Sequence, residues 1–362
     1  MKWLKKLIKF IVAGLILLFV VILILQKFGN ITHRISFSGL GTLPDKFKLY
    51  HLRPTSDGKL LVGGAIPSGD NSRDPSIFFQ NGDELTQIFS PQIVSWSPPE
   101  NGYGWIAAIG NKDDIIVAAL KSYKSSGGVE GRDYEIYVST DLGKSWSNRG
   151  KLPAVLHSAK NELSLIEIIV HDQNTFWLVG LNILGKTNDG AKSWKSFPIP
   201  FNKTTLSSNL IIENGDQLLY SGEGLAQSSD SAKSWKVISE NKIEASDGTY
   251  YLSSNKDQSE TRLEKLINGK LELISTIEES LLVESISHLG MKVFFTASVI
   301  GTGSVVGEAE LRIYISIDGG KTFKNKMIHG IGLNGDNITT SSGEIWRVRQ
   351  NRTIYRATIP SK

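Results

Sequence analysis

A short pattern recurs four times in this chain and constrains its fold more than any other feature. Each copy reads Ser/Thr-x-Asp-x-Gly/Ala-x-Ser/Thr-Trp/Phe, and successive aspartates are 48, 41 and 88 residues apart. The last gap is about two of the others. A period in the forties indicates one structural unit copied along the chain. The four copies are Ser139–Trp146, Thr187–Trp194, Ser228–Trp235 and Ser316–Phe323.

The residue types in the pattern predict a tight turn between two strands. A short Asp side chain accepts hydrogen bonds from backbone N–H groups a few residues further on. Glycine tolerates the positive φ that tight hairpins require, and the closing aromatic packs back over the turn. Apolar runs lead into the first and last copies, at Ile136–Val138 and Ile313–Ile315. We therefore expect strand, turn and strand in each copy.

The pattern resembles the Asp box, or BNR repeat, of sialidases and related β-propellers, and the resemblance covers Tyr137 to Phe323. Two copies depart from it, with Ala191 and Ala232 in place of glycine. The resemblance implies that these turns lie on the face opposite the one that binds substrate, and that their residues are structural. The residues concerned are Ser139, Asp141, Gly143, Trp146, Asp189, Trp194, Asp230, Trp235, Ser316, Asp318, Gly320 and Phe323.

The period divides residues 47–362 into blades of an all-β propeller. Short aromatic and β-branched runs, broken by Gly, Asn, Asp and Ser, are typical of such a fold. Seven four-stranded blades are predicted, with six as the alternative. The fifth, near residues 241–277, lacks the turn pattern. The tail, Gly335 to Ile359, offers only two or three strands. Residues before the first blade, near His33–Ser38, are expected to supply the missing strand of this last blade, because ring closure leaves no long exposed strand edge.

The first 27 residues predict a membrane anchor, followed by a tether at residues 28–46. Phe10 to Leu25 is a run of apolar or small residues without charge, and Leu7-Ile8 extends it past Lys9. A span needs about 20 residues, and flanking lysines reach the headgroups. Four lysines precede the run and one follows it, which places the N-terminus in the cytoplasm. The prediction is an uncleaved signal anchor in the cytoplasmic membrane, with a cleaved signal peptide as the alternative.

Charge and cysteine content narrow the function classes. The formal charge of +4 comes from five lysines in the first 27 residues, and without them 35 basic residues face 36 acidic ones. Nucleic-acid binding therefore lacks an electrostatic basis. The chain has no cysteine, which excludes disulfides and thiolate sites. Six scattered histidines show no metal-ligand spacing, so neither a metal nor a cofactor is predicted.

Two insertions point to the binding face. Lys121–Gly131 and Ala297–Gly307 each precede the third strand of a blade. In a meander the turn between strands two and three lies opposite the turn between strands three and four. Both insertions are therefore expected on the face opposite the repeated turn, although loop slack is an equally simple explanation. Tyr123, Lys124 and Trp96 are the binding candidates, whereas Trp105 and Trp177 are expected in the core.

A sialidase-type active site is the alternative class of function. Such a site needs three arginines converging on a substrate carboxylate, a Tyr activated by a Glu, and an acid. Tyr50-His-Leu-Arg53-Pro54 resembles loosely the segment that carries the first arginine in sialidases. The other candidates are Asp74 as acid, Arg312 and Arg347 as further arginines, and Tyr355 as nucleophile. Each choice is one of several available, since the chain has ten tyrosines.

The blades most resemble those of photosystem II stability/assembly-factor-like propellers. That resemblance implies a membrane-anchored protein-binding module that helps to assemble or protect a membrane complex. In a bacterium with two membranes the propeller would lie in the periplasm. A neutraliser of an incoming periplasmic toxin would need the same parts. The predicted partner is thus a protein in or near the membrane, and the fold alone does not identify it.

Overall fold

The computed structural model describes residues 37–359 apart from short gaps. The gaps are residue 56, 68–72, 92–102, 127–128, 154–155, 157–164, 181–182, 202–208, 215–216, 255–258, 301–308, 328–336, 342 and 349–352. Residues 1–36, and with them the predicted membrane anchor, lie outside the described part. Within the described ranges, no helix has the length and apolarity of a bilayer span.

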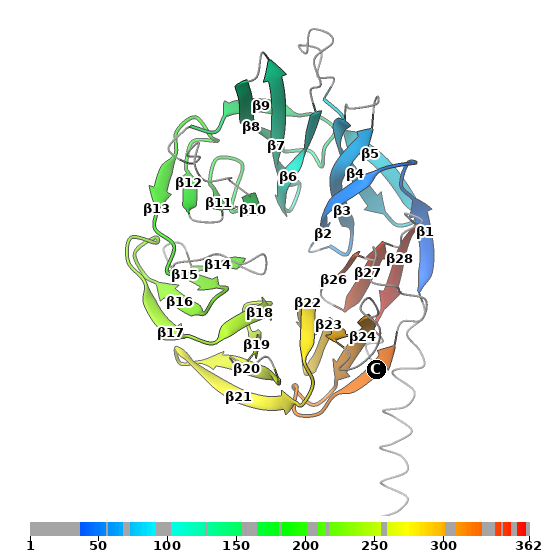
Figure 1. Cartoon of the computed structure of the whole chain (residues 1–362), viewed down its shortest axis with the longest axis vertical. Helices are drawn as coiled ribbons and strands as arrows, with labels where there is room; N and C mark the ends of the chain where they lie inside the picture. The colour runs from blue at the N-terminus through cyan, green and yellow to red at the C-terminus, as the bar shows by residue number, and fades with distance from the viewer. Residues whose placement is uncertain are drawn as a thin grey trace, which may run out of the picture.

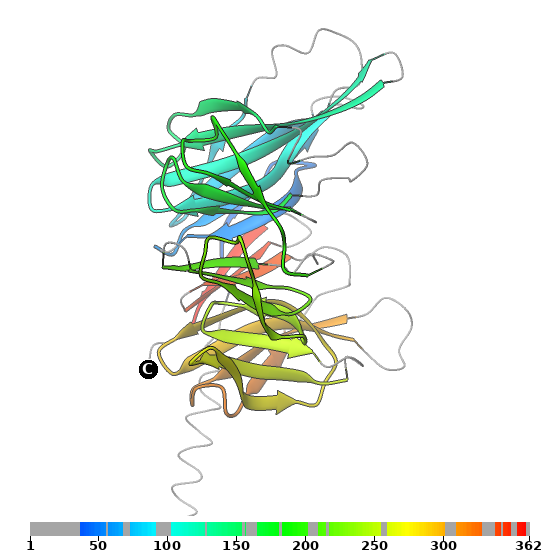
Figure 2. The same ribbon diagram turned by 90° about the vertical axis from the view of Figure 1, so that its left-hand side faces the viewer.

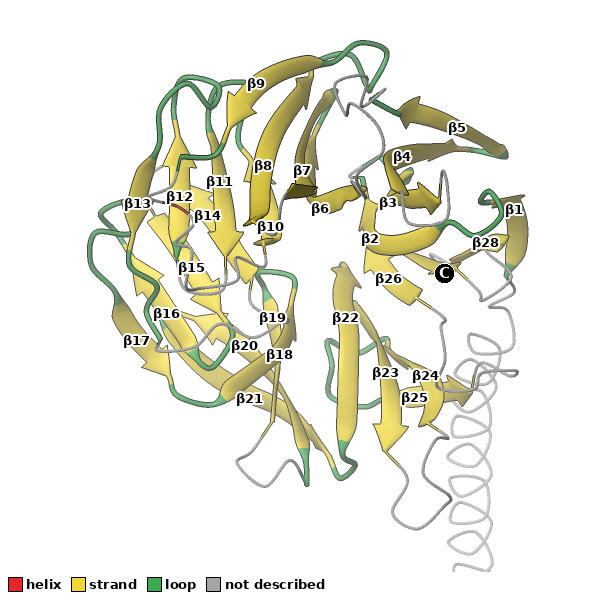
Figure 3. Ribbon diagram, turned by 45° about the horizontal axis from the view of Figure 1, so that its top comes forward, coloured by secondary structure: helices red, strands yellow, loops and turns green. Residues whose placement is uncertain are grey.

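The described chain forms a ring of seven antiparallel blades, as predicted, and the six-bladed alternative does not apply (Figures 1 and 3). Each blade is a meander of four strands whose first strand lies nearest the ring axis (Figure 1).

Blade one contains β2 (Lys48–Pro54), β3 (Leu60–Pro67), β4 (Arg73–Asn81) and β5 (Glu84–Phe89). Blade two contains β6 (Tyr103–Lys112), β7 (Ile115–Ser126), β8 (Val129–Ser139) and β9 (Ser147–Lys151). Blade three contains β10 (Leu165–Val170), β11 (Phe176–Gly180), β12 (Leu184–Thr187) and β13 (Lys195–Phe197). Blades four to six contain β14 (Asn209–Asn214), β15 (Gln217–Ser221), β16 (Leu225–Ser228) and β17 (Lys236–Ser239); β18 (Lys242–Ser246), β19 (Tyr250–Ser254), β20 (Thr261–Ile267) and β21 (Lys270–Ile277); and β22 (Leu281–Leu289), β23 (Lys292–Ile300), β24 (Ala309–Ser316) and β25 (Lys324–Met327).

The seventh blade closes the ring with a strand from the start of the described chain. Its first three strands are β26 (Asn337–Ser341), β27 (Glu344–Val348) and β28 (Thr353–Thr358), and its outer strand is β1 (Ser38–Thr42). β1 pairs antiparallel with β28, from Ser38 opposite Arg356 to Thr42 opposite Thr353. The predicted closure is thus confirmed, with the strand beginning at Ser38 rather than ending there.

The core consists of seven apolar clusters, one at each contact between neighbouring blades. Side chains alternate between the two faces of a strand, so each central strand serves two clusters. In β11, Phe176 and Leu178 face blade two, whereas Trp177 and Val179 face blade four. Trp177 is buried, as predicted. Each blade is therefore stabilised mainly by its neighbours, which explains why the ring must close.

Blades one and two are also joined through the backbone. β4 and β6 share a parallel bridge between Arg73 and Tyr103, which merges the two blades into one sheet. Blade two also carries a long hairpin, β7–β8, which extends beyond the rest of the ring in the side view (Figure 2). Most of the predicted insertion Lys121–Gly131 is therefore paired strand rather than loop slack. Of the second insertion, residues 301–307 lie outside the described part.

Candidate functional site

The four repeated turns, hereafter the Asp turns, share one hydrogen-bond pattern. In the first, the Ser139 hydroxyl donates to Asp141 Oδ1 (2.8 Å) and accepts the N–H of Gly143 (2.8 Å). Asp141 in turn accepts the backbone N–H and the hydroxyl of Ser145 at 2.9 and 2.6 Å. The same contacts recur at Asp189, Asp230 and Asp318.

Hydrogen bonding within the Asp turns leaves their carboxylates strongly acidic. Bonds from the following Ser hydroxyl and N–H lower the pKa of Asp141, Asp189 and Asp230 to about 2. The alanine copies keep the shape of the glycine copies, since Ala191 and Ala232 have φ of 74° and 64° where Gly143 and Gly320 have 85° and 89°. Both carboxylate oxygens of each of these aspartates accept hydrogen bonds from their own turn, which agrees with the structural role that the sequence resemblance implies.

In two of the Asp turns, the tryptophan donates a hydrogen bond to the preceding blade. Trp146 Nε1 donates to the Ile88 carbonyl in β5 (2.7 Å), and Trp235 Nε1 donates to the Pro198 carbonyl just after β13 (3.0 Å). Asp turns also contact the inner turn of their own blade, as in the bond from Leu142 N–H to the Asp114 carbonyl (2.9 Å). We call this side of the ring the turn face, and the other side the opposite face.

On the opposite face, aromatic and basic side chains gather over blades one and two. Tyr50 and Trp105 are each the third residue of an inner strand, and their ring centroids lie 6.3 Å apart. Arg73 Nη1 donates to Tyr50 Oη at 3.3 Å. Lys121 pairs with both Trp105 and Tyr134 in register, and its Nζ lies 5.1 and 5.3 Å from their rings. We call these five residues the Tyr50–Trp105 cluster.

Tyr50 lies at a β-bulge of a kind that recurs in the inner strands of blades two to six. The pairing of β2 with β3 shifts register between Leu49 and His51, so Tyr50 has no partner in the ladder. A bulge turns its extra residue out of the regular alternation, and 41% of Tyr50 is exposed. Trp105 is half-buried against it rather than in the core, which corrects the expectation from its strand context.

Beneath the cluster, charged groups line the inner wall of the ring. Arg53 of blade one reaches Glu167 of blade three, with Nη2 2.5 Å from Oε1. The pair therefore crosses in front of the inner strand of blade two. His51, two residues before Arg53, interacts with the backbone of Ile106 and Ala107. Burial together with the Arg53 charge lowers the pKa of His51 to about 4, so the imidazole is neutral at pH 7. Glu167 is about nine-tenths buried, and its Oε2 has no hydrogen-bond partner.

The arginines considered for a sialidase-type site occupy different places. Arg53 is next to the last residue of β2, at the turn face. Arg312 lies in β24 and pairs with Glu279 (3.3 Å), while Arg347 is buried in β27 beneath the ring of Phe37. Register places both toward the opposite face. Asp74 is the second residue of β4, and Tyr355 lies in β28.

Tyr–Glu pairs are present beside two of the Asp turns, with tyrosines at equivalent positions. Tyr314 donates to Glu279 (2.7 Å) and Tyr137 donates to Glu135 (2.9 Å). Both tyrosines lie two residues before the Ser of an Asp turn and pack against a phenylalanine. Burial, followed by the Glu partner, raises the pKa of both phenols. The phenol thus stays protonated, which disfavours it as a nucleophile.

The side chains of the three predicted binding residues lie outside the described part of the structure. Trp96 lies outside the described residues, and the side chains of Tyr123 and Lys124 lie outside the described part of hairpin β7–β8. The cluster that the structure does place, from Tyr50 to Tyr134, was missed by the sequence. Only Lys121, the first residue of the predicted insertion, pointed toward it.

The ring of seven blades makes the chain a β-propeller. No protein-family model and no curated protein matches the sequence. Among solved structures, the chain is similar to YCF48 from Cyanidioschyzon merolae, with a TM-score of 0.53 at 12% identity over 89% of this chain and 98% of that one. It is equally similar to YCF48 bound to D1 peptide (TM-score 0.53, 11% identity, 90% and 97% covered). Trypanosoma rangeli sialidase with the inhibitor DANA is a weaker likeness (TM-score 0.44, 10% identity, 86% and 55% covered).

Proposed function

We propose that the chain is a single-pass membrane protein whose propeller lies outside the cytoplasm and binds a protein partner with its opposite face. The binding surface is the Tyr50–Trp105 cluster together with the neighbouring hairpin β7–β8. The observation that carries the proposal is the exposed Tyr50 ring, held beside Trp105 and capped by Arg73. Tyr, Trp and Arg are the residues that most often dominate the energy of protein interfaces.

Three further points support this proposal. The bulge in β2 carries an aromatic ring, that of Tyr50, where the equivalent bulges of β6 and β22 carry Ala107 and Glu284. The bridge between β4 and β6 joins the two blades that carry the cluster into one sheet. A propeller of similar fold, YCF48, has been solved bound to D1 peptide. The basic groups of the cluster favour a partner segment that carries acidic and apolar side chains.

The membrane part of the proposal is supported by the uncharged run Phe10–Leu25 and the four lysines that precede it. A span of this type with the basic end in the cytoplasm leaves residues 28–362 on the other side. The propeller would be periplasmic in a bacterium with two membranes.

Site-specific photocrosslinking in intact membranes tests the binding surface. A photoreactive phenylalanine analogue is placed at Tyr50 in one variant and at Leu273 in a control. Leu273 is 57% exposed on the outer strand β21, away from the cluster. We expect a discrete protein adduct with the analogue at position 50 and none with the analogue at position 273. A competing copy of the chain that carries Tyr50→Ala should not suppress the adduct at position 50. Equal labelling at both positions, or no adduct at either, refutes the proposal.

A further inference from the structure

The direction of β1 fixes the side from which the N-terminal segment reaches the ring. Glu344, which follows the inner turn of blade seven, pairs with Thr358, so the 358 end of β28 lies at the turn face. Ser38 pairs with Arg356 and Thr42 with Thr353. The chain therefore enters β1 near the turn face and runs toward the opposite face. Residues 1–36 are joined to the ring at the rim of blade seven.

The connection to the predicted membrane span is short. Only residues 26–36, about 11 residues, separate Leu25 from Phe37. Even fully extended they span about 40 Å at most. A compact body of this size has a radius of gyration of about 20 Å and hence a diameter of roughly 50 Å. In a chain anchored as proposed, the tether is shorter than the body is wide, so the turn-face end of β1 lies within about 40 Å of the bilayer.

The turn face of the adjoining blade six carries an unusual inner turn. Leu289 and Met291 flank Gly290 between β22 and β23, and they are 43% and 62% exposed. Corresponding inner turns of other blades are polar, as in Asp113–Asp114 and Gly248–Thr249. Both side chains stay exposed although Leu289 Cδ2 lies near Gly343 and Met291 Cε near Gly319. Blade six directly adjoins the blade at which the tether arrives.

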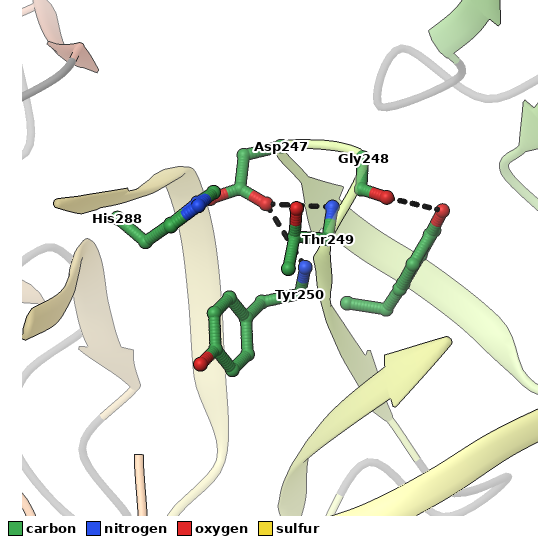
Figure 4. A network of polar contacts seen from close by, with 6 residues as sticks. Asp247, Gly248, Thr249, Tyr250 and His288 are labelled. Carbon is green, nitrogen blue, oxygen red and sulfur yellow. Dashed lines mark hydrogen bonds and ion pairs between the residues drawn. The ribbon is translucent and has the colours of Figure 1, made fainter. Parts of the chain in front are cut away.

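Charge around this turn is basic. Lys292, Lys321 and Lys324 lie on the two turns of blade six or next to them. The one carboxylate in the same turns, Asp318, is held by the hydroxyl of Ser316 and by Thr322. In the neighbouring blade, Asp247 of blade five pairs with His288 at 2.7 Å, and its other oxygen accepts two N–H groups of its own turn (Figure 4). The patch thus combines an apolar tip with a basic surround.

We propose that this surface, which we call the blade-six turn patch (Leu289, Met291, Lys292, Lys321 and Lys324), docks on an anionic phospholipid surface, namely the membrane in which the chain is anchored. Apolar side chains enter the headgroup boundary while lysines pair with lipid phosphates. The proposal rests on the proposed anchor and adds the orientation of the ring. The turn face lies on the bilayer, and the Tyr50–Trp105 cluster points into the aqueous compartment. The partner segment is therefore presented from the aqueous side.

Labelling of single cysteines tests this orientation, because the chain has no cysteine of its own. Blade six offers a matched pair: Met291 on the turn face, and Leu282 at the other end of β22, 48% exposed. Full-length Met291→Cys and Leu282→Cys variants are labelled with an environment-sensitive dye and reconstituted in vesicles of phosphatidylcholine alone or with phosphatidylserine.

We expect the label at position 291 to shift to the blue and to be several-fold protected from aqueous iodide in the anionic vesicles. The label at position 282 should stay exposed. A Lys321→Glu change should reduce the protection at 291 without changing the label at 282. Equal quenching at both positions, or protection at 282, overturns the inference while the anchor stands. Release of the full chain from vesicles by carbonate instead contradicts the anchor itself.

Discussion

The Asp turns allow a prediction in which two inverse substitutions differ strongly in effect. Gly143 and Ala191 occupy equivalent positions, and both have left-handed backbone, with φ of 85° and 74°. A Cβ added at Gly143 would lie 2.5 Å from Ile88 Cδ1 and 2.8 Å from Ile88 Cβ. The methyl group of Ala191, in contrast, is buried in the cluster between blades two and three. The environment rather than the turn geometry decides which residue fits.

The magnitudes follow from these contacts. For Gly143→Ala, left-handed backbone costs about 1–2 kcal/mol and overpacking about 1–3 kcal/mol. Reduced freedom of the unfolded chain offsets about 0.4–1 kcal/mol. The free energy of unfolding should therefore fall by about 2–4 kcal/mol. For Ala191→Gly, relief of the left-handed strain is offset by the loss of a buried methyl group, about 0.8 kcal/mol, and by glycine's greater freedom when unfolded. The net change should lie within about 1 kcal/mol of zero.

Urea unfolding of the full-length chain, followed by tryptophan fluorescence, measures both changes. At an unchanged slope, the midpoint should drop clearly for Gly143→Ala and stay near the parent value for Ala191→Gly. A Gly39→Ala variant is the control, because its Cβ would meet only ordinary contacts at 3.8 and 3.9 Å. If Gly143→Ala proves as mild as Ala191→Gly, the contact with Ile88 does not determine the glycine and the reasoning fails.

Three further outcomes are expected. Hydrogen bonds lower the pKa of Asp141, Asp189 and Asp230 to about 2. The contribution of these carboxylates to the free energy of unfolding is therefore complete above about pH 4 and is lost as the pH falls through 2. In urea titrations at several pH values, the unfolding midpoint of Asp189→Asn should fall less at acidic pH than that of the parent. Glu167→Gln should lower the free energy of unfolding by about 1–2 kcal/mol, less than the 3–5 kcal/mol of a fully buried pair, because a third of the Arg53 side chain is exposed. An unchanged free energy of unfolding in a denaturant titration would contradict the Arg53–Glu167 ion pair. Tyr314→Phe should remove a phenol that titrates above its ordinary pKa of 10. In ultraviolet pH titrations, the variant should therefore show less tyrosinate absorbance than the parent only in the most alkaline range. A difference between the two proteins below pH 10 would show that the Glu279 contact does not hold the proton.

The sequence predicted the ring well because the ring depends on repeated local features. The hydroxyl, the aspartate and the aromatic residue of each Asp turn interact within eight residues of one another, so their pattern can be recognised in the sequence. The fifth blade lacks the pattern, and there Asn268-Gly269 supplies the two left-handed residues of the turn between β20 and β21. Closure was also predictable, since a blade left with three strands needs a fourth. The position of β1 was missed by a few residues because it depends on pairing with β28, more than 300 residues away.

The candidate site was hardly predictable, for a physical reason. Tyr50 lies outside the β2–β3 ladder because of a bulge, and a bulge is a property of two paired strands rather than of a sequence window. The alternation around Trp105 reads as buried strand, yet its neighbour across the blade boundary is Tyr50. Contacts of this kind arise only when the inner strands of different blades are brought together around the axis. The same holds for Arg53 and Glu167, which are distant in sequence and come from blades one and three.

The two faces of the ring differ because they are made of different connections. On the turn face, each Asp turn is fixed by internal hydrogen bonds and by a tryptophan or phenylalanine, so little can be added there without loss of the fold. On the opposite face, both predicted insertions precede third strands. Hairpin β7–β8 extends β-pairing past the ring from there, beside Lys121 and the exposed Tyr50. The blade-six turn patch is the exception on the turn face, since its apolar residues lie on an inner turn that has no Asp pattern to preserve. A surface on each side, one toward the bilayer and one away from it, is therefore what the positions of the rigid and the variable turns together favour.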